Sequence, residues 1–497
     1  MIKIIGAVAV INILARLIGF ARETVIGYQY GTSILADSII TAYTIPNFLY
    51  IVVGGAVTTA FISVYSKLPD GEGKQKFLSS TFTYITILIG IVTALLLFFA
   101  EPILKLSFRG LTGEELEITK KLFSWMAPST FFLVWSMWLS GILNVHQRFQ
   151  LSSFSTLIYN LAFLAIAVIF TPWMHVDSYG LGALLGAVIM VVMLIVGLKK
   201  DFIQHFRFRF EHTDELKRLW IIALPIMLGG ASLQFYFFIQ RVFASHLSDG
   251  YIAALNYASK LTQFPQAVLM TAVTTVIYPL LAKKVGARED EGVSELYQKG
   301  MSLLGLLLLP VTVFVFFYSK EIVSIIFEYG NFNEDSTRMT TPLLQIFSLS
   351  MFAMAGTVYV TRFFYAMEKS YLTVLISLVC VFGVNIIVTM MLLDRYGAEA
   401  IAWGTSISSI VNLILLMMLA KFMLKLTMKN NLGQTMKSIA LYGSLIVVLF
   451  LSSTYIKTGW VWGDIVVGGF IFIIVFIGGL KVLRFSELNF ILRKKSV

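Results

Sequence analysis

Residues 178–198 read SYGLGALLGAVIMVVMLIVGL and contain no charged side chain. A helix of about 20 apolar residues crosses a hydrocarbon core of roughly 30 Å. Outward from this stretch, about thirteen further runs of the same kind follow one another along the chain, from residues 4–27 to residues 460–480. Only 13% of the residues are charged, whereas an ordinary soluble domain carries about 25%. The sequence therefore predicts an all-α integral membrane protein with about fourteen transmembrane helices.

The first apolar run is expected to be a retained helix, because Arg16 and Arg22 interrupt it and no small-residue cleavage pattern follows. The single cysteine, Cys380, lies in an apolar run, so a disulfide within the chain is excluded and a packing role is expected. The five histidines lack the spacing of metal ligands, and no metal is assigned to them.

The basic residues are distributed unevenly between the two sides of the predicted membrane. The net charge is +11. With a cytoplasmic N-terminus and strict alternation, most Lys and Arg residues fall on the cytoplasmic side, while Asp and Glu are nearly balanced. This positive-inside pattern predicts a multi-pass membrane protein with both termini in the cytoplasm. It explains the basic character of the chain without a nucleic-acid partner.

An internal repeat organises the chain. Arg22, Gly31 and Pro46 recur 219 positions later as Arg241, Gly250 and Pro265. A further match at a spacing of 214 extends the repeat across the fourth helix, where Arg148-Phe149 corresponds to Arg362-Phe363. Six helices separate the copies, so both have the same orientation, as in transporters that rock two lobes around a central site. The predicted lobes are residues 1–210 (helices 1–6) and 211–430 (helices 7–12). Residues 431–497 add helices 13 and 14 and a basic cytoplasmic tail.

Seven ionisable side chains fall inside the predicted spans. They are Arg16, Arg22, Glu23, Asp37, Arg241, Lys260 and Arg362. A charge near the bilayer centre costs about 2.5 to 3.5 kcal/mol, so such residues are hypotheses for a functional site. Two carboxylates cannot neutralise five cations, and a basic cavity for an anion such as a pyrophosphate is predicted. Two structural alternatives stay open: an Arg16–Glu23 or Arg22–Asp37 ion pair that locks two helices, and snorkelling of Arg362 to the interface.

Glycines and prolines in the spans predict close packing and bending. Gly182 with Gly186 is expected to allow neighbouring helices to approach closely. Pro46 and Pro265 occupy equivalent positions in the repeat, and each removes a helix hydrogen bond, so both are predicted hinges.

A set of short motifs is found near the N-terminus and in the second half of the repeat: Ala15-Arg16-Leu17-Ile18-Gly19-Phe20-Ala21-Arg22-Glu23, Gly31, Ala36-Asp37-Ser38, Ile45-Pro46-Asn47-Phe48-Leu49 and Phe264-Pro265. With these motifs the chain resembles the MurJ-type lipid II flippases (MVN family) of the multidrug/oligosaccharidyl-lipid/polysaccharide (MOP) exporter superfamily. The resemblance covers essentially the whole chain. Members of the family often carry a basic pair and a glutamate after Pro-Asn, where this chain has Tyr50-Ile51 and Gly54-Gly55.

The resemblance implies two six-helix lobes around a cationic cavity, with the last two helices beside a groove for a polyprenyl tail. It implies functional roles for Arg16, Arg22 and Asp37, with Lys260 where the family usually has arginine. The implied activity is translocation of lipid II from the inner to the outer leaflet of the bacterial cytoplasmic (inner) membrane, for peptidoglycan synthesis. No cofactor is expected, and coupling to the membrane potential or to a monovalent ion is a hypothesis drawn from the family.

Other functions remain as alternatives. A related exporter would carry another polyprenyl-linked glycan, such as a capsule or teichuronic-type unit. A drug/cation antiporter would need carboxylates facing its substrate, which helices 7–12 lack, and a membrane glycosyltransferase would need a large outer loop with acidic or histidine chemistry. The expected partners are an anionic lipid-linked glycan, the bilayer, and the cell-wall synthesis or division machinery.

Overall fold

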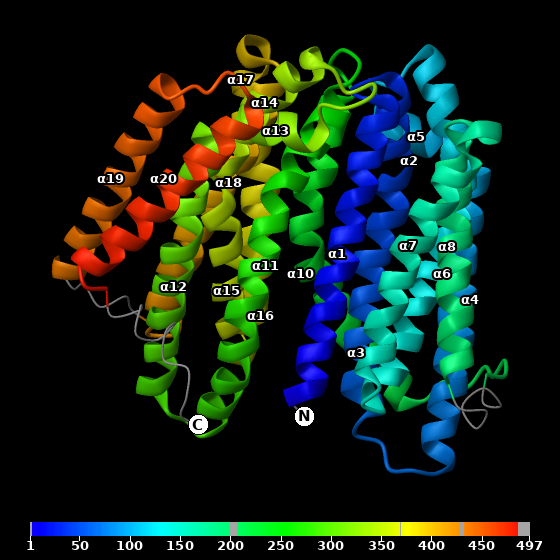
Figure 1. Cartoon of the computed structure of the whole chain (residues 1–497). Coiled ribbons are helices and arrows are strands. Elements are labelled where there is room, and N and C mark those ends of the chain that lie inside the picture. Colours follow the sequence, from blue (N-terminus) through cyan, green and yellow to red (C-terminus); the bar gives the residue numbers. More distant parts are fainter. Residues whose placement is uncertain (1, 199–205, 368, 427–431, 486–497) are drawn as a thin grey trace. The chain divides into compact units, whose positions relative to one another are not determined.

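The computed structural model describes residues 2–198, 206–367, 369–426 and 432–485. Across these residues every regular element is helical and no strand occurs (Figure 1). Ten of the described helices are long and apolar enough to cross a membrane, and two bent helix pairs raise the number to twelve if each pair is one span. The predicted all-α membrane architecture is confirmed, while the number of fourteen spans stays a prediction.

The chain separates into two compact units, residues 1–253 and 254–497. The first unit ends in the first turn of α11 and contains, in chain order, α1 (Ile2–Tyr30), α2 (Ile34–Leu49), the π-helix η1 (Tyr50–Gly54), α3 (Gly55–Tyr65), α4 (Glu72–Phe98), α5 (Ala100–Ser107), α6 (Gly113–Val145), α7 (Phe149–Met174), α8 (Asp177–Gly197) and α10 (Asp214–Ala244).

The second unit holds the remainder of the chain. It contains the rest of α11 (Tyr251–Gly286), followed by α12 (Asp290–Phe317), α13 (Ser319–Phe327), α14 (Glu334–Ser348), α15 (Met351–Ala366), α16 (Ser370–Leu378), the π-helix η2 (Val379–Asn385), α17 (Ile386–Tyr396), α18 (Ala398–Met423), α19 (Leu432–Tyr455) and α20 (Val461–Val482).

Packing places α10 with the N-terminal helices. The ring centroid of Phe48 on α2 lies 5.2 Å from that of Phe235 and 6.1 Å from that of Phe238, both on α10. The predicted lobe boundary at residues 210 and 211 follows the sequence repeat, whereas the division by contacts falls at residues 253 and 254. The two boundaries differ because large aromatic side chains join α10 to α2.

The repeat is visible in the backbone at two glycines. Gly31, after α1, has a φ of 59°, and Gly250, before α11, has a φ of 88°. Residues other than glycine rarely adopt a positive φ, because their Cβ would crowd the backbone. A Cβ on Gly250 would also lie 2.4 Å from the carbonyl oxygen of Thr32. Equivalent positions of the repeat thus require glycine for the same chain reversal between consecutive helices.

The second predicted span is one 32-residue helical run, Ile34–Tyr65, that contains the π-helix η1. The turn begins four residues after Pro46, and its last residue, Gly54, lets Met137 of α6 approach to 3.0 Å from where a Cβ would stand. A π-turn inside a helix often occurs at a functional site. Pro265 lies in the 36-residue helix α11. The hinge roles of both prolines stay predictions.

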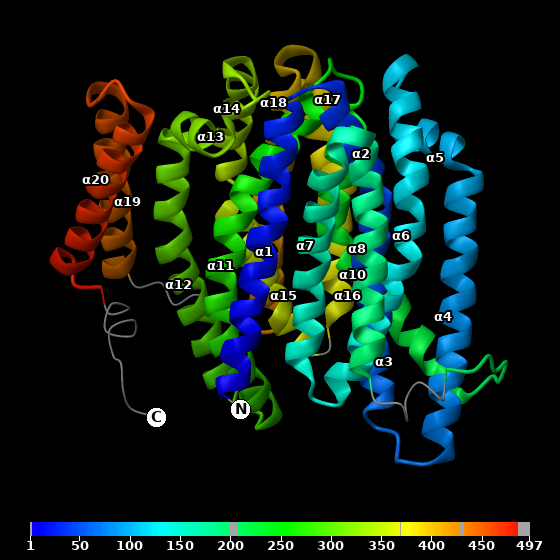
Figure 2. The same cartoon turned by 45° about the vertical axis from the view of Figure 1, so that its right-hand side comes forward.

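Close helix packing at Gly182 and Gly186 is confirmed between α7 and α8, which lie side by side in Figures 1 and 2. A Cβ on Gly182 would stand 2.6 Å from the carbonyl oxygen of Phe163, and one on Gly186 would stand 3.1 Å from the Phe163 nitrogen. These neighbours are backbone atoms, which cannot move aside without distorting α7. The glycines therefore fix the distance between the two helices.

We expect Gly182→Ala to destabilise the first unit by about 1 to 3 kcal/mol, the usual range for overpacking. The thermal unfolding midpoint of the purified protein in detergent would measure the effect. Gly90→Ala on α4 is the matched control, because nothing lies within 4 Å of its Cβ position. Equal midpoints for the two variants would show that α7 and α8 separate at little cost.

The C-terminal helices α19 and α20 are anchored on α12 and α13. Leu306 of α12 packs with Leu441 and Leu445 of α19. At the other end, the hydroxyl oxygens of Tyr318 and Ser452 lie 2.8 Å apart. These two helices, which follow the two repeated lobes in the sequence, are thus part of the core of the second unit.

An ion pair at the α19–α20 turn reinforces this anchoring. Lys457 Nζ lies 2.8 Å from an oxygen of the buried Glu321. Partial burial disfavours the charged form of Lys457, but the hydrogen bond and the charge of Glu321 outweigh it, so the pKa of Lys457 is raised. The turn therefore carries a cation that is stabilised by α13.

Candidate anion-binding site

Arg22 of α1 is held between two aromatic rings. Its guanidinium carbon lies 4.6 Å from the ring centroid of Phe163 on α7 and 5.1 Å from that of Tyr43 on α2. Its Nη2 donates a 3.0 Å hydrogen bond to Glu23. Aromatic faces attract cations through the ring quadrupole, and the attraction is worth about 0.5 to 2 kcal/mol. Three helices thus fix the place of one arginine.

The aromatic partners of Arg22 contact one another. The hydroxyl oxygens of Tyr43 and Tyr159 lie 2.7 Å apart, and the Phe163 ring lies 5.7 Å from Tyr43 and 6.0 Å from Tyr159. Tyr159 and Phe163 are four residues apart and share a face of α7. We call Tyr43, Tyr159 and Phe163 the Arg22 cage. The cage orients a planar cation inside the first unit.

Glu23 faces more than one cation. Its side chain is 5% exposed and pairs with Arg22. Arg241 of α10 lies within electrostatic range of the same carboxylate. One carboxylate of the first unit therefore interacts with two arginines.

Asp37 has a different environment from the one expected of a substrate-binding carboxylate. Its Oδ2 accepts a 2.6 Å hydrogen bond from the Gly250 N–H, and its Oδ1 accepts a 2.7 Å bond from the Ala253 N–H. These N–H groups flank the first turn of α11, where the helix has unsatisfied donors and a positive dipole end. Asp37 thus caps the start of α11 from α2.

Neither of the two ion pairs left open by the sequence forms among the described residues. Arg22 bonds to the adjacent Glu23, and Asp37 accepts from backbone instead. Arg16 is exposed and makes no ion pair there. The alternative of an Arg16–Glu23 or Arg22–Asp37 ion pair was therefore wrong. The spacing of residues in the sequence does not show that backbone N–H groups of a distant helix reach Asp37.

The two remaining candidates lie in the second unit. Lys260 of α11 is partly buried, and Arg362 of α15 is exposed. Arg148, the repeat partner of Arg362, donates a 2.7 Å hydrogen bond to the carbonyl oxygen of Gly197 at the end of α8. Roles for Lys260 and Arg362 in anion binding stay predictions.

The sequence analysis did not single out the Arg22 cage. The search followed charges, and an aromatic residue in an apolar span is ordinarily a packing residue. The spacing of Tyr159 and Phe163 was the only local signal, and it gives no indication that α7 faces Arg22.

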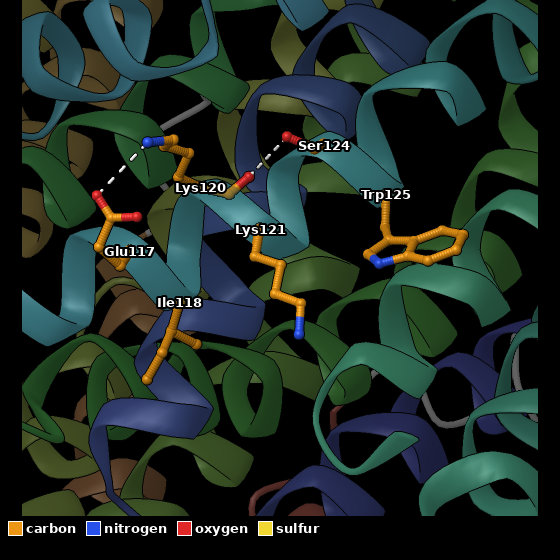
Figure 3. A pocket seen from close by; sticks show the side chains of 6 residues that line it. All are labelled: Glu117, Ile118, Lys120, Lys121, Ser124 and Trp125. Atoms are coloured by element: carbon orange, nitrogen blue, oxygen red, sulfur yellow. Dashed lines mark hydrogen bonds and ion pairs between the residues drawn. The ribbon is translucent and has the colours of Figure 1, made fainter. Parts of the chain in front are cut away.

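A surface hollow of about 690 Å³ lies over the first turns of α6. It is lined by Glu117, Ile118, Lys120, Lys121, Ser124 and Trp125 (Figure 3). Lys120 pairs with Glu117 and Glu101, and Lys121 pairs with Asp177. Because each lysine already has a carboxylate partner, the hollow is electrostatically balanced.

The ion pairs around this hollow also change the pKa of a carboxyl group on α5. Hydrogen bonds from Lys105 and Lys120, with the charges of both lysines, lower the pKa of Glu101 to about 2. Glu101 therefore stays ionised at physiological pH. No cluster of three or more potential metal ligands occurs within the described parts of the chain.

Comparison with solved structures defines the class of protein. A structure described as "Lipid II flippase MurJ, inward closed conformation" superposes with a TM-score of 0.80, covering 96% of this chain and 99% of the other at 22% identity. An inward-facing multidrug resistance MATE family transporter of the MOP superfamily gives 0.70, covering 85% and 99% at 13% identity. The fold is that of the membrane transporters of this superfamily.

Sequence comparison narrows the class to one family. The family described as lipid II flippase MurJ matches residues 26–471. A probable lipid II flippase MurJ of Rickettsia prowazekii is 26% identical over 415 residues, which are 82% of this chain and 81% of the relative. The chain belongs to the lipid II flippase MurJ family. The predicted family is confirmed, and flippases are transporters rather than enzymes.

Proposed function

We propose that the chain translocates lipid II, a polyprenyl-pyrophosphate-linked cell-wall precursor, from the inner to the outer leaflet of the cytoplasmic membrane. Membership of the family supports the substrate. The observation that carries the site is the Arg22 cage beside Glu23, because it presents an oriented guanidinium next to a second arginine. Guanidinium groups match phosphate oxygens in geometry and in charge.

We infer an alternating-access cycle from the same contacts. An arriving pyrophosphate competes with Glu23 for Arg22 and Arg241, so binding weakens the attraction that Glu23 provides. Release on the other side requires the Asp37 cap on α11 to separate. A substrate shifts the equilibrium between two conformations only if its contacts differ between them. The pairing of Glu23 with the arginines and the Asp37 cap on α11 supply this difference in the proposed cycle.

The orientation and energy source are parts of the proposal. The positive-inside pattern supports cytoplasmic termini. Coupling to the membrane potential or a monovalent ion is proposed for the return step, and an association with the cell-wall synthesis or division machinery is proposed for substrate supply. Dissipating the potential in proteoliposomes, with and without an ion gradient, separates the two energy sources.

Leaflet-resolved quantification of labelled lipid II tests the function. Depletion of the protein is expected to accumulate precursor in the inner leaflet and to deplete it in the outer leaflet. An exporter of another polyprenyl-linked glycan would leave the lipid II distribution unchanged, and a glycosyltransferase would accumulate an unmodified acceptor. Either result would overturn the assignment of lipid II as substrate.

A further inference from the structure

The segment between α8 and α10 is attached to α4 through aromatic side chains. The Phe206 ring stacks on Phe82 at 5.4 Å between centroids and lies 5.3 Å from the ring of Trp138 on α6. The Phe208 ring also lies 5.4 Å from Phe82. Phe82 and Trp138 are buried. The segment is therefore seated on the core of the first unit.

Hydrogen bonds fix the position of the segment along α4. The Arg209 N–H donates to Thr83 Oγ1 at 2.7 Å. Further along, the Tyr84 hydroxyl and His212 Nδ1 lie 2.9 Å apart. Figures 1 and 2 both show the green segment before α10 beside α4. Three consecutive residues of α4, 82–84, thus hold the chain at one height.

That height corresponds to the edge of the hydrocarbon core. α4 is a candidate span that ends at Phe98, and about 20 residues of helix cross the core. Counting back from Phe98 reaches Ser79, so Thr83 lies roughly 6 Å inside that limit at 1.5 Å per residue. Residues 206–212 are therefore expected to lie within roughly 6 Å of the boundary between lipid tails and headgroups.

Cations and exposed aromatic rings alternate along the segment. Phe208 and Phe210 are 64% and 68% exposed, and Arg207 and Arg209, each directly before one of these rings, are exposed as well. In an extended chain, neighbouring side chains point to opposite sides. Phenyl rings at this depth contact acyl chains, while guanidinium groups reach phosphates.

The carboxylates of the described residues do not pair with every arginine of the segment. Arg209 Nε pairs with Glu211 at 3.1 Å. The carboxylate of Glu72 also interacts electrostatically with Arg209, but it forms a 2.8 Å ion pair with Lys76. Arg207 makes no ion pair with any described residue. The segment thus carries at least one guanidinium that no carboxylate of the described residues neutralises.

We propose that residues 206–212 form a binding strip for anionic phospholipid headgroups of the leaflet on that side of the membrane. The strip is built by this chain's own contacts with α4 and does not depend on the transported substrate. Each basic residue near an anionic surface strengthens lipid binding about fivefold. The expected preference for an anionic over a zwitterionic headgroup is therefore at least about fivefold.

Short-range quenching in nanodiscs tests the strip in the full-length protein. A bimane label on Phe210→Cys reports contact with lipids, and the fully buried Cys380 is not expected to react. Phosphatidylglycerol or phosphatidylcholine carries a nitroxide at acyl position 5 or 12. We expect phosphatidylglycerol to quench about fivefold more effectively at equal mole fraction, and position 5 to quench more than position 12.

Paired substitutions separate the strip from a general charge effect. Arg207→Gln with Arg209→Gln is expected to abolish the headgroup preference. Lys283→Gln with Arg288→Gln removes the same charge from exposed positions elsewhere and is expected to keep it. Equal quenching by both lipids, quenching by aqueous iodide instead of lipid, or loss of the preference in the control pair would each overturn the proposal.

Discussion

Arg22→Lys is expected to lose most lipid II translocation even though the positive charge is kept. The cage presents two ring faces to a planar guanidinium, with the Phe163 and Tyr43 centroids at 4.6 and 5.1 Å. An ammonium group cannot stack on both rings and offer a two-pronged contact to a phosphate. Hydrogen bonds to charged groups contribute about 1.5 to 3 kcal/mol, so we expect a decrease in rate on the order of 10- to 100-fold. Arg22→Ala should abolish complementation.

The cage itself is tested by Phe163→Leu, with Phe170→Leu on the same helix as the matched control. Loss of one cation–π contact of about 0.5 to 2 kcal/mol predicts a roughly 2- to 30-fold weaker binding of a pyrophosphate-lipid analogue. Phe170 is exposed, and its ring lies 6.1 Å from that of Trp173. Monodisperse elution of both variants shows that folding is intact. A weakening that also appears with an uncharged lipid analogue would assign Phe163 to packing alone.

The sequence predicted the architecture well because its signal is local. Apolar runs such as residues 178–198 correspond to spans such as α8, and the constraint of lipid on backbone polar groups leaves helices as the solution. Arg22 and Gly31 matched Arg241 and Gly250 in the repeat, and the backbone of the two glycines has the same sign of φ. Periodicity and composition were sufficient for these features.

The site was only partly predictable, because its partners come from other helices. The charge argument selected Arg22, Glu23 and Asp37, but it could not show that α7 supplies a ring to Arg22. The role of Asp37 in substrate binding stays a prediction, and the charge argument did not show that the oxygens of Asp37 accept N–H groups from Gly250 and Ala253. Those positions are more than 200 residues away in sequence, and backbone donors leave no mark in residue types.

Asp37→Asn is the substitution with the largest expected effect on conformation. The two N–H donors bond to different oxygens of Asp37, at 2.6 and 2.7 Å. An amide has one oxygen, so its NH₂ group would face the other N–H, and the charge that favours the start of a helix is lost. With about 1.5 to 3 kcal/mol for a charge-assisted bond, the joined state of α2 and α11 should lose roughly 10- to 100-fold in relative population.

Hydrogen exchange of the backbone amides of residues 250–253 measures this shift directly. We expect exchange in Asp37→Asn to accelerate by the same factor, because exchange follows the population of the locally open state. Asp177→Asn is the control for the loss of a carboxylate elsewhere, since Asp177 lies in the first turn of α8, pairs with the exposed Lys121 and does not cap α11. If both variants exchange at the wild-type rate, the cap does not hold α11, and the release step proposed for the transport cycle loses its structural basis.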